Sequence, residues 1–86
     1  MSKASHVCEL IVTDLIDQGF IRISRQKLEE TIMQHRGIDE RTVARWTRAL
    51  LTLNYIKGVG PNLFEINILM IPNVIARLKD KQTKIQ

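Results

Sequence analysis

The sequence predicts a single α+β domain that is mostly α-helical, and three observations lead to this prediction. The chain has 86 residues, which suffices for one hydrophobic core, so residues 1–86 are expected to form one domain. Apolar side chains recur every three or four residues in three successive stretches, as in amphipathic helices. In residues 63–68 the apolar period falls to two, which is typical of a half-buried β-strand.

The first predicted helix covers residues 4–18. Its apolar stripe repeats about every four residues and consists of Val7, Cys8, Ile11, Leu15 and Ile16. Gly19 then supplies a stop signal. Cys8 lies beside the stripe, and no second metal-ligating or catalytic side chain is spaced with it. We therefore expect Cys8 to be a small core residue.

A short strand and a second helix follow. Residues 20–23 are rich in β-branched and aromatic side chains and predict the strand. Ser24 is a good N-cap, because its hydroxyl can accept a hydrogen bond from a backbone N–H two or three residues further on. The helix is expected to extend to about His35 and to end at Gly37, since glycine tolerates the left-handed conformation found at helix C-termini. The side chains expected to face inward are Leu28 and Ile32.

The third helix, predicted over residues 40–53, is the most informative part of the sequence. Ile38 is expected to be buried in the preceding turn, Asp39 can cap the helix, and Glu40 complements the positive end of the helix dipole. At about 100° per residue, the side chains predicted on the inward face are Val43, Trp46, Leu50, Leu53 and Asn54. The opposite face carries Arg41, Arg45, Arg48 and Thr52 within an arc of about 60°. Thr42 and Ala49 flank this arc. One face should therefore pack on the core, while the other carries three guanidinium groups and no acid.

A β-hairpin and a last helix complete the predicted order. Residues 55–59 and 63–68 read as the two strands, and the turn formers in residues 60–62 join them. The tip lacks large apolar side chains and is expected to project into solvent or onto a partner. Pro72 suits the first turn of a last helix within residues 70–86.

The charges are distributed unevenly along the chain, whose net charge is +4. Residues 1–40 carry five basic and seven acidic side chains, for a net charge of −2. Residues 41–86 carry eight basic and two acidic side chains, for a net charge of +6. This asymmetry suggests a polyanionic partner, either a nucleic acid or a membrane surface, although ordinary surface charge is the alternative interpretation.

A segment that spans the predicted turn reads Gly37-Ile38-Asp39-Glu40-Arg41-Thr42-Val43-Ala44-Arg45-Trp46. It resembles the turn and recognition helix of the winged helix-turn-helix family, in which a glycine and an aliphatic residue precede a polar cap, a Thr-Val pair and an outward arginine. Leu50 and residues 54–56 resemble the end of that helix and the start of the first wing strand. The resemblance rests on residues 24–68, and Met33 departs from it, because the family usually has a small residue there. The implied fold is a three-helix core with a β-hairpin wing, here with an extra C-terminal helix.

The resemblance implies sequence-specific binding of double-stranded DNA, with residues 40–53 in the major groove. It also implies a role in transcription regulation, like that of small stand-alone archaeal, viral or plasmid regulators. Arg45 is placed for a base edge, where its fork can pair with guanine O6 and N7, and Arg48 is placed for the phosphate backbone. Trp46 could stack on a base, but its register with the apolar face favours core packing. The residues expected to contact DNA are Ser24, Arg25, Gln26, Arg41, Thr42, Arg45, Arg48, Lys57 and Asn62.

The apolar stripe of the last helix has two interpretations. Its members are Ile71, Val74, Ile75, Leu78 and Ile85. Their spacing resembles a short heptad seam, which would join two chains into a homodimer and place two recognition helices on half-sites about one DNA turn apart. We favour the homodimer because the core of one chain is small. The alternative is that residues 71–78 fold back on the first helix and complete the core of a monomer.

The remaining function classes are less well supported. His6 and His35 lie on different predicted helices, and their spacing is not that of metal ligands. The sequence also lacks a catalytic constellation and a glycine-rich phosphate loop. We therefore expect that the protein is not an enzyme and that it has no metal, cofactor or small-molecule substrate. The main alternative is a winged-helix module that binds protein within a replication, transcription or membrane-remodelling assembly. No apolar run predicts a membrane span or a signal peptide, and the one cysteine fits a reducing, cytoplasmic location without membrane association.

Overall fold

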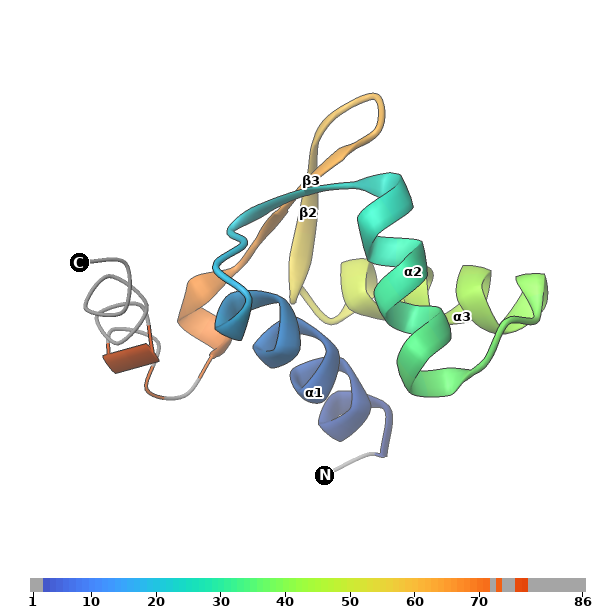
Figure 1. Cartoon of the computed structure of the whole chain (residues 1–86), viewed down its shortest axis with the longest axis horizontal. Coiled ribbons are helices and arrows are strands. Elements are labelled where there is room, and N and C mark those ends of the chain that lie inside the picture. Colours follow the sequence, from blue (N-terminus) through green and yellow to red (C-terminus); the bar gives the residue numbers. More distant parts are fainter. Residues whose placement is uncertain (1–2, 72, 74–75, 78–86) are drawn as a thin grey trace.

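The computed structural model describes residues 3–71, 73, 76 and 77 of the chain. Three helices are combined with a small antiparallel sheet, an arrangement consistent with a winged-helix-like topology (Figure 1). The elements in chain order are α1 (Lys3–Asp17), β1 (Arg22–Ser24), α2 (Arg25–Arg36), α3 (Glu40–Thr52), β2 (Ile56–Gly60), β3 (Leu63–Ile66) and a 3₁₀ turn η1 (Ile68–Met70). The three predicted helices and the hairpin are therefore confirmed.

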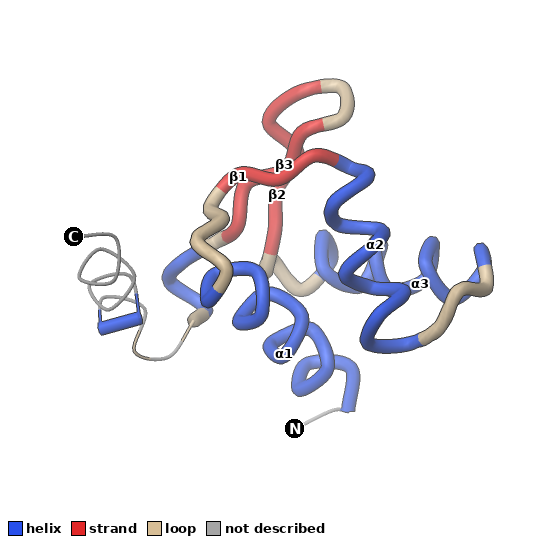
Figure 2. The backbone as a smooth tube through the Cα atoms, in the orientation of Figure 1, coloured by secondary structure: helices blue, strands red, loops and turns tan. Residues whose placement is uncertain are grey.

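The sheet has the strand order β1-β3-β2, and both pairings are antiparallel. Arg22 of β1 lies opposite Glu65 of β3, and Lys57 of β2 lies opposite the same glutamate from the other side. The β2–β3 register shifts between Gly58 and Gly60, which is where the hairpin approaches its tip. Figure 2 shows that the hairpin extends beyond the helices, past the start of α2.

The core lies between the three helices and the inner face of the sheet. Its position follows from the apolar stripes, since each helix turns one apolar side inward and leaves its polar side to solvent. Its buried apolar side chains among the described residues are Cys8, Ile11, Val12, Leu15, Ile16, Ile23, Leu28, Ile32, Val43, Trp46, Leu50, Tyr55, Ile56, Phe64, Ile66 and Ile71. The core roles predicted for Cys8 and Trp46 are thus confirmed.

Local capping signals fix where α2 and α3 begin. The Ser24 hydroxyl accepts a hydrogen bond from the backbone N–H of Lys27 at 3.1 Å, as an N-cap does. The Asp39 carboxylate accepts one from the backbone N–H of Arg41 at 2.9 Å. Between the two helices, Gly37 has a φ of 113°, a conformation that favours glycine, and its N–H bonds to the carbonyl of Met33.

Three predicted burials at the ends of α3 are wrong. Ile38 was expected to be buried in the turn, but its side chain is 84% exposed, because the turn between Gly37 and the Asp39 cap directs it outward. Leu53 and Asn54 were expected on the inward face of the helix, yet both are exposed. The helix ends at Thr52, and Asn54 has a left-handed φ of 65°, so helical periodicity no longer governs these two positions.

Two smaller differences concern the strands. The first strand was predicted over residues 20–23 and is observed over Arg22–Ser24, with Phe20 and Ile21 exposed before it. The last strand was predicted to reach Ile68, but β3 ends at Ile66 and a 3₁₀ turn follows. The Asn67 side chain caps that turn by accepting from the N–H of Leu69, so its backbone leaves the sheet there.

The predicted C-terminal helix falls almost wholly outside the described residues. Ile71 is buried, at 5% exposure, in the core of its own chain. Arg77 donates to both carboxylate oxygens of Asp17 on α1 at 2.8 Å, and its N–H bonds to the carbonyl of Asn73 at 3.0 Å. No helix in the described part of the chain has the length and apolar character needed to cross a membrane.

Candidate nucleic-acid interface

The outward face of α3 is basic and exposed. The four side chains predicted there are all exposed to solvent, namely Arg41, Arg45, Arg48 and Thr52. They point outward because the opposite side of the helix is buried through Val43, Trp46, Thr47 and Leu50. Within the described residues, no carboxylate forms an ion pair with any of these three arginines. Within this part of the chain, their positive charges are therefore not neutralised by a carboxylate.

Thr47 is a buried residue on α3 that the sequence pattern missed. Its hydroxyl donates to the backbone carbonyl of Val43 at 2.9 Å, so its polar atom is satisfied inside the helix. Thr31 does the same on α2, where it donates to the carbonyl of Lys27 at 2.9 Å. These bonds let a threonine occupy an inward position that apolar periodicity alone does not mark.

The N-terminus of α2 and the tip of the hairpin are held together. The backbone N–H of Arg25 donates to the carbonyl of Asn62 at 2.9 Å. The Arg25 guanidinium lies 5.4 Å from the centre of the Phe64 ring, a distance suited to a cation–π contact. Two predicted site residues from distant parts of the sequence, Arg25 and Asn62, thus lie at one place. Ser24 and Gln26 are exposed beside them, although the Ser24 hydroxyl is already used as a cap.

A groove of about 570 Å³ separates α2 from α3. Arg25 lines it from α2 and Arg48 from α3, so both basic residues border the same groove. Its other lining residues are Glu29, Met33, Ile38, Glu40, Val43, Ala44, Thr47 and Leu51. The groove therefore has an apolar floor with both acidic and basic groups at its rim, and Met33, where the family usually has a small residue, forms part of that floor.

Lys57, predicted as a wing contact, lies at the base of the hairpin and is paired. Its ammonium is 3.3 Å from the Glu65 carboxylate, which also accepts a hydrogen bond from Arg22 at 3.0 Å. These hydrogen bonds, first from Arg22 and then from Lys57, lower the pKa of Glu65. The Lys57 side chain is 69% exposed, so the pair is a weak surface contact that a stronger anion could displace.

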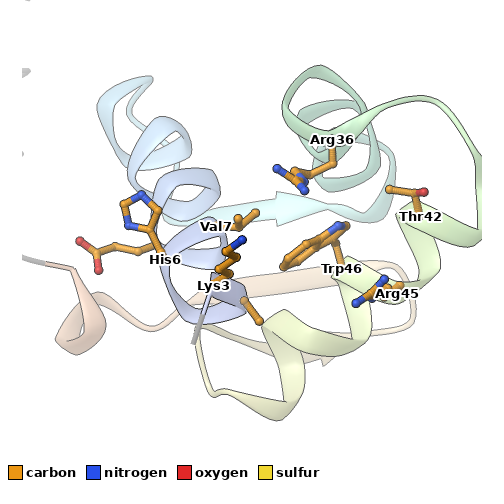
Figure 3. Close-up of a pocket in the computed structure, with 9 residues that line it drawn as sticks. Lys3, His6, Val7, Arg36, Thr42, Arg45 and Trp46 are labelled. Carbon is orange, nitrogen blue, oxygen red and sulfur yellow. The ribbon is translucent and has the colours of Figure 1, made fainter. Parts of the chain in front are cut away.

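A second and larger cavity, of about 920 Å³, lies between α1 and α3. Arg45 and Thr42 line it from α3, together with Trp46. Lys3 of α1 and Arg36 of α2 reach the same cavity (Figure 3). Lys3 and Arg36 are not among the site residues predicted from sequence, because only the packing of α1 and α2 against α3 brings them near the arginines of that helix.

Of the five predicted dimer residues, Ile71 alone lies within the described part of the chain. Ile71 is part of the chain's own core, and Val74, Ile75, Leu78 and Ile85 lie outside the described residues. The homodimer therefore stays a prediction. In the part of the chain that the structure describes, no three His, Cys, Asp or Glu side chains are grouped closely enough to hold a metal ion.

Comparisons of this chain with protein-family models, with curated proteins and with solved structures give no match.

Proposed function

We propose that this protein binds double-stranded DNA in a sequence-specific manner, with α3 in the major groove, and that it regulates transcription. The observation that carries the proposal is the exposed face of α3, on which three arginines have no carboxylate partner among the described residues. A major groove about 12 Å wide admits one α-helix, and arginine is the side chain best suited to pair with guanine. The position of α3, after a capped turn and before a hairpin, adds support.

In this proposal the contacts divide into base readout and backbone positioning. Arg45, midway along the basic face of the helix, pairs with a base edge, while Arg41 and Thr42 near the helix start meet a base or a phosphate. Arg48, further along the helix, meets the phosphate backbone, and its place on the same groove as Arg25 supports this role.

The N-terminus of α2 supplies a second backbone contact in this proposal. The N–H groups of Arg25 and Lys27 are already hydrogen-bonded, so the contact rests on the positive end of the helix dipole and on the exposed Arg25 side chain, both of which favour a phosphate. The hydrogen bond from the Arg25 N–H to Asn62 keeps the hairpin tip beside this helix start. Asn62 and, at the base of the hairpin, Lys57 can then meet the same stretch of backbone.

The experiment that tests this proposal is selection of binding sites from random DNA duplexes. We expect the selected duplexes to share one short sequence that the helix reads in the major groove. If the protein is a homodimer, this sequence should occur as an inverted repeat. Binding that is independent of sequence would reduce the proposal to a general architectural role. Recovery of no bound DNA at low salt would overturn it.

A module that binds protein is the second candidate, and the α2–α3 groove favours it. Ile38, Ala44 and Leu51 are exposed apolar residues on this groove, while Glu29 and Arg48 supply charges of opposite sign. An amphipathic partner helix could place its apolar face there. If the protein binds a partner helix in this groove and does not bind DNA, Leu51→Asp should abolish binding of that helix, because it places a charge among the apolar residues of the groove.

A further inference from the structure

The cavity between α1 and α3 gathers basic side chains from three helices. Lys3 comes from the start of α1, Arg36 from the last residue of α2, and Arg45 from the middle of α3. All three are exposed, so their charged groups are accessible from solvent. Arg45 also belongs to the outward face of α3, so the cavity is continuous with the proposed DNA-binding surface.

Trp46 holds two of these cations in place. Its ring is only 8% exposed and is anchored in the core beside Val43 and Leu50. The Arg36 guanidinium lies 5.3 Å from a ring centre of Trp46, and the Arg45 guanidinium lies 6.0 Å from it. Figure 3 shows the indole between the two arginines. Both distances are within cation–π range, so a rigid ring limits the freedom of two otherwise flexible side chains.

The described residues around the cavity supply little negative charge to balance these groups. Glu9 is the acidic residue among those that line the cavity. The described residues include no ion pair that involves Lys3, Arg36 or Arg45. Like charges that are held near each other without a counter-charge raise the free energy of the unbound protein. An anion that neutralises them is therefore bound favourably.

We propose that this cavity binds the phosphodiester backbone of the DNA strand that borders the major groove, with Arg36 and Lys3 as phosphate ligands and Trp46 as a positioning residue. The proposal rests on the proposed function, because Arg45 connects the two surfaces. A chain of phosphates fits better than one small anion, because the basic groups around the cavity come from three different helices. Guanidinium groups pair with phosphate oxygens in a planar, two-pronged geometry.

The test is the affinity of the Arg36→Gln variant of the full chain for one duplex, measured by fluorescence anisotropy at several salt concentrations. Lys27→Gln is the matched control. It removes the same charge from the same helix, but Lys27 lies over the Phe20 ring, 5.2 Å from its centre, and lines neither cavity. We expect Arg36→Gln to bind about tenfold more weakly at low salt, with a slope of log affinity against log salt that is about one less steep.

The outcomes separate this inference from the proposed function. If the wild-type protein binds DNA but Arg36→Gln and Lys27→Gln behave alike, the cavity does not contact the backbone and only the inference is overturned. If the wild-type protein binds no duplex at any salt concentration, both proposals fail. Lys3→Gln provides a second variant in a different helix. We expect it, too, to make the slope of log affinity against log salt about one less steep.

The positioning role of Trp46 needs a readout that loss of packing alone would not change. Trp46→Phe keeps an aromatic ring, whereas Trp46→Leu keeps apolar volume without one. With folding of both variants checked by circular dichroism, Trp46→Phe should retain several-fold more affinity for DNA than Trp46→Leu. Because Trp46 is the one tryptophan of the chain, its emission should also change when the wild-type protein binds DNA. Equal affinities of the two variants would contradict the positioning role.

Discussion

At the scale of single residues, Arg45 has the central place in the proposed interface. It lies midway along α3, on the basic face, and borders the cavity beside α1. We expect Arg45→Ala to weaken specific DNA binding by about 1–3 kcal/mol, because a bidentate pair with guanine would be lost. A titration of the selected duplex at fixed salt measures the effect, with Lys27→Ala as the control for loss of one charge. Equal affinities of wild type and Arg45→Ala would remove Arg45 from the interface.

A second residue-scale prediction concerns an ion pair between α1 and α2. The His35 ring nitrogen Nε2 lies 2.8 Å from a carboxylate oxygen of Asp14. Partial burial alone would raise the pKa of Asp14, but hydrogen bonds with His35 and Gln18 outweigh it, so the pKa is lowered. A carboxyl whose pKa is lower in the folded than in the unfolded state stabilises the fold above its unfolded pKa, which is near 4. This contribution is lost as the pH falls through the folded pKa.

His35→Ala should therefore raise the pKa of Asp14 and make stability less dependent on pH below about 4. The pKa is measured by NMR titration of the carboxyl carbon, and stability by urea unfolding at several pH values. His6→Ala is the matched control, since His6 borders the cavity beside α3 instead. An unchanged Asp14 pKa in His35→Ala would show that the pair contributes nothing in solution.

At the scale of elements, the cap of α2 gives a test of why this helix begins where it does. Ser24→Ala removes the acceptor of the Lys27 N–H and should cost about 1 kcal/mol of unfolding free energy. Ser24→Thr should keep most of the stability, because its hydroxyl can cap as well. Urea denaturation of both variants measures the difference. A Ser24→Ala variant as stable as the wild type would mean that water replaces the cap without loss.

The helices were largely predictable from sequence because their signals are local. Ser24, Asp39 and Gly37 mark helix ends through their own side chains or backbone, without help from distant residues. The wrong predictions fall just beyond such ends. Ile38 and Asn54 lie in turns, where the direction of a side chain depends on backbone angles that apolar periodicity does not report.

The candidate site was predictable only where it occupies one element. The α3 arginines share a helix face, so their spacing alone brings them together. Arg36 and Lys3 reach the same surface through the packing of three helices around Trp46, which no spacing in the sequence encodes. Lys57 was selected for its charge, but the register of the sheet places Glu65 opposite it.

At the scale of the whole molecule, the oligomeric state separates the two interpretations of the C-terminal stripe. A heptad seam needs Ile85, whereas a fold-back of residues 71–78 onto α1 does not. The burial of Ile71 and the Arg77–Asp17 contact involve that shorter segment. If the protein is a homodimer, light scattering at micromolar concentration should give twice the chain mass, and Ile85→Lys should give a monomer of lower thermal stability, because subunit association stabilises the folded state. A monomer mass for the wild-type protein would exclude the seam.

The distribution of charge over the whole molecule agrees with binding through one surface. From Arg41 to Lys57 the chain carries four basic residues and no acid. The acids of α1 and α2 include Asp14 and Asp17, which pair with His35 and Arg77 away from the α3 arginines. A net charge of +4 would favour many anionic partners weakly, but the exposed face of α3, where Arg41, Arg45 and Arg48 lie without an acid among them, favours a phosphate-rich groove.

The measurement that tests the central claim most directly is duplex DNA binding by the wild-type protein as a function of salt. Neutralised phosphates release counterions, so the logarithm of the binding constant should fall linearly with the logarithm of salt concentration, with a slope of about −0.9 for each phosphate contacted. Backbone contacts by Arg48, Arg25 and Arg36 predict a slope of about −3 or steeper. No binding at low salt, or binding whose affinity is independent of salt, would contradict the claim that this protein binds DNA through its basic helix.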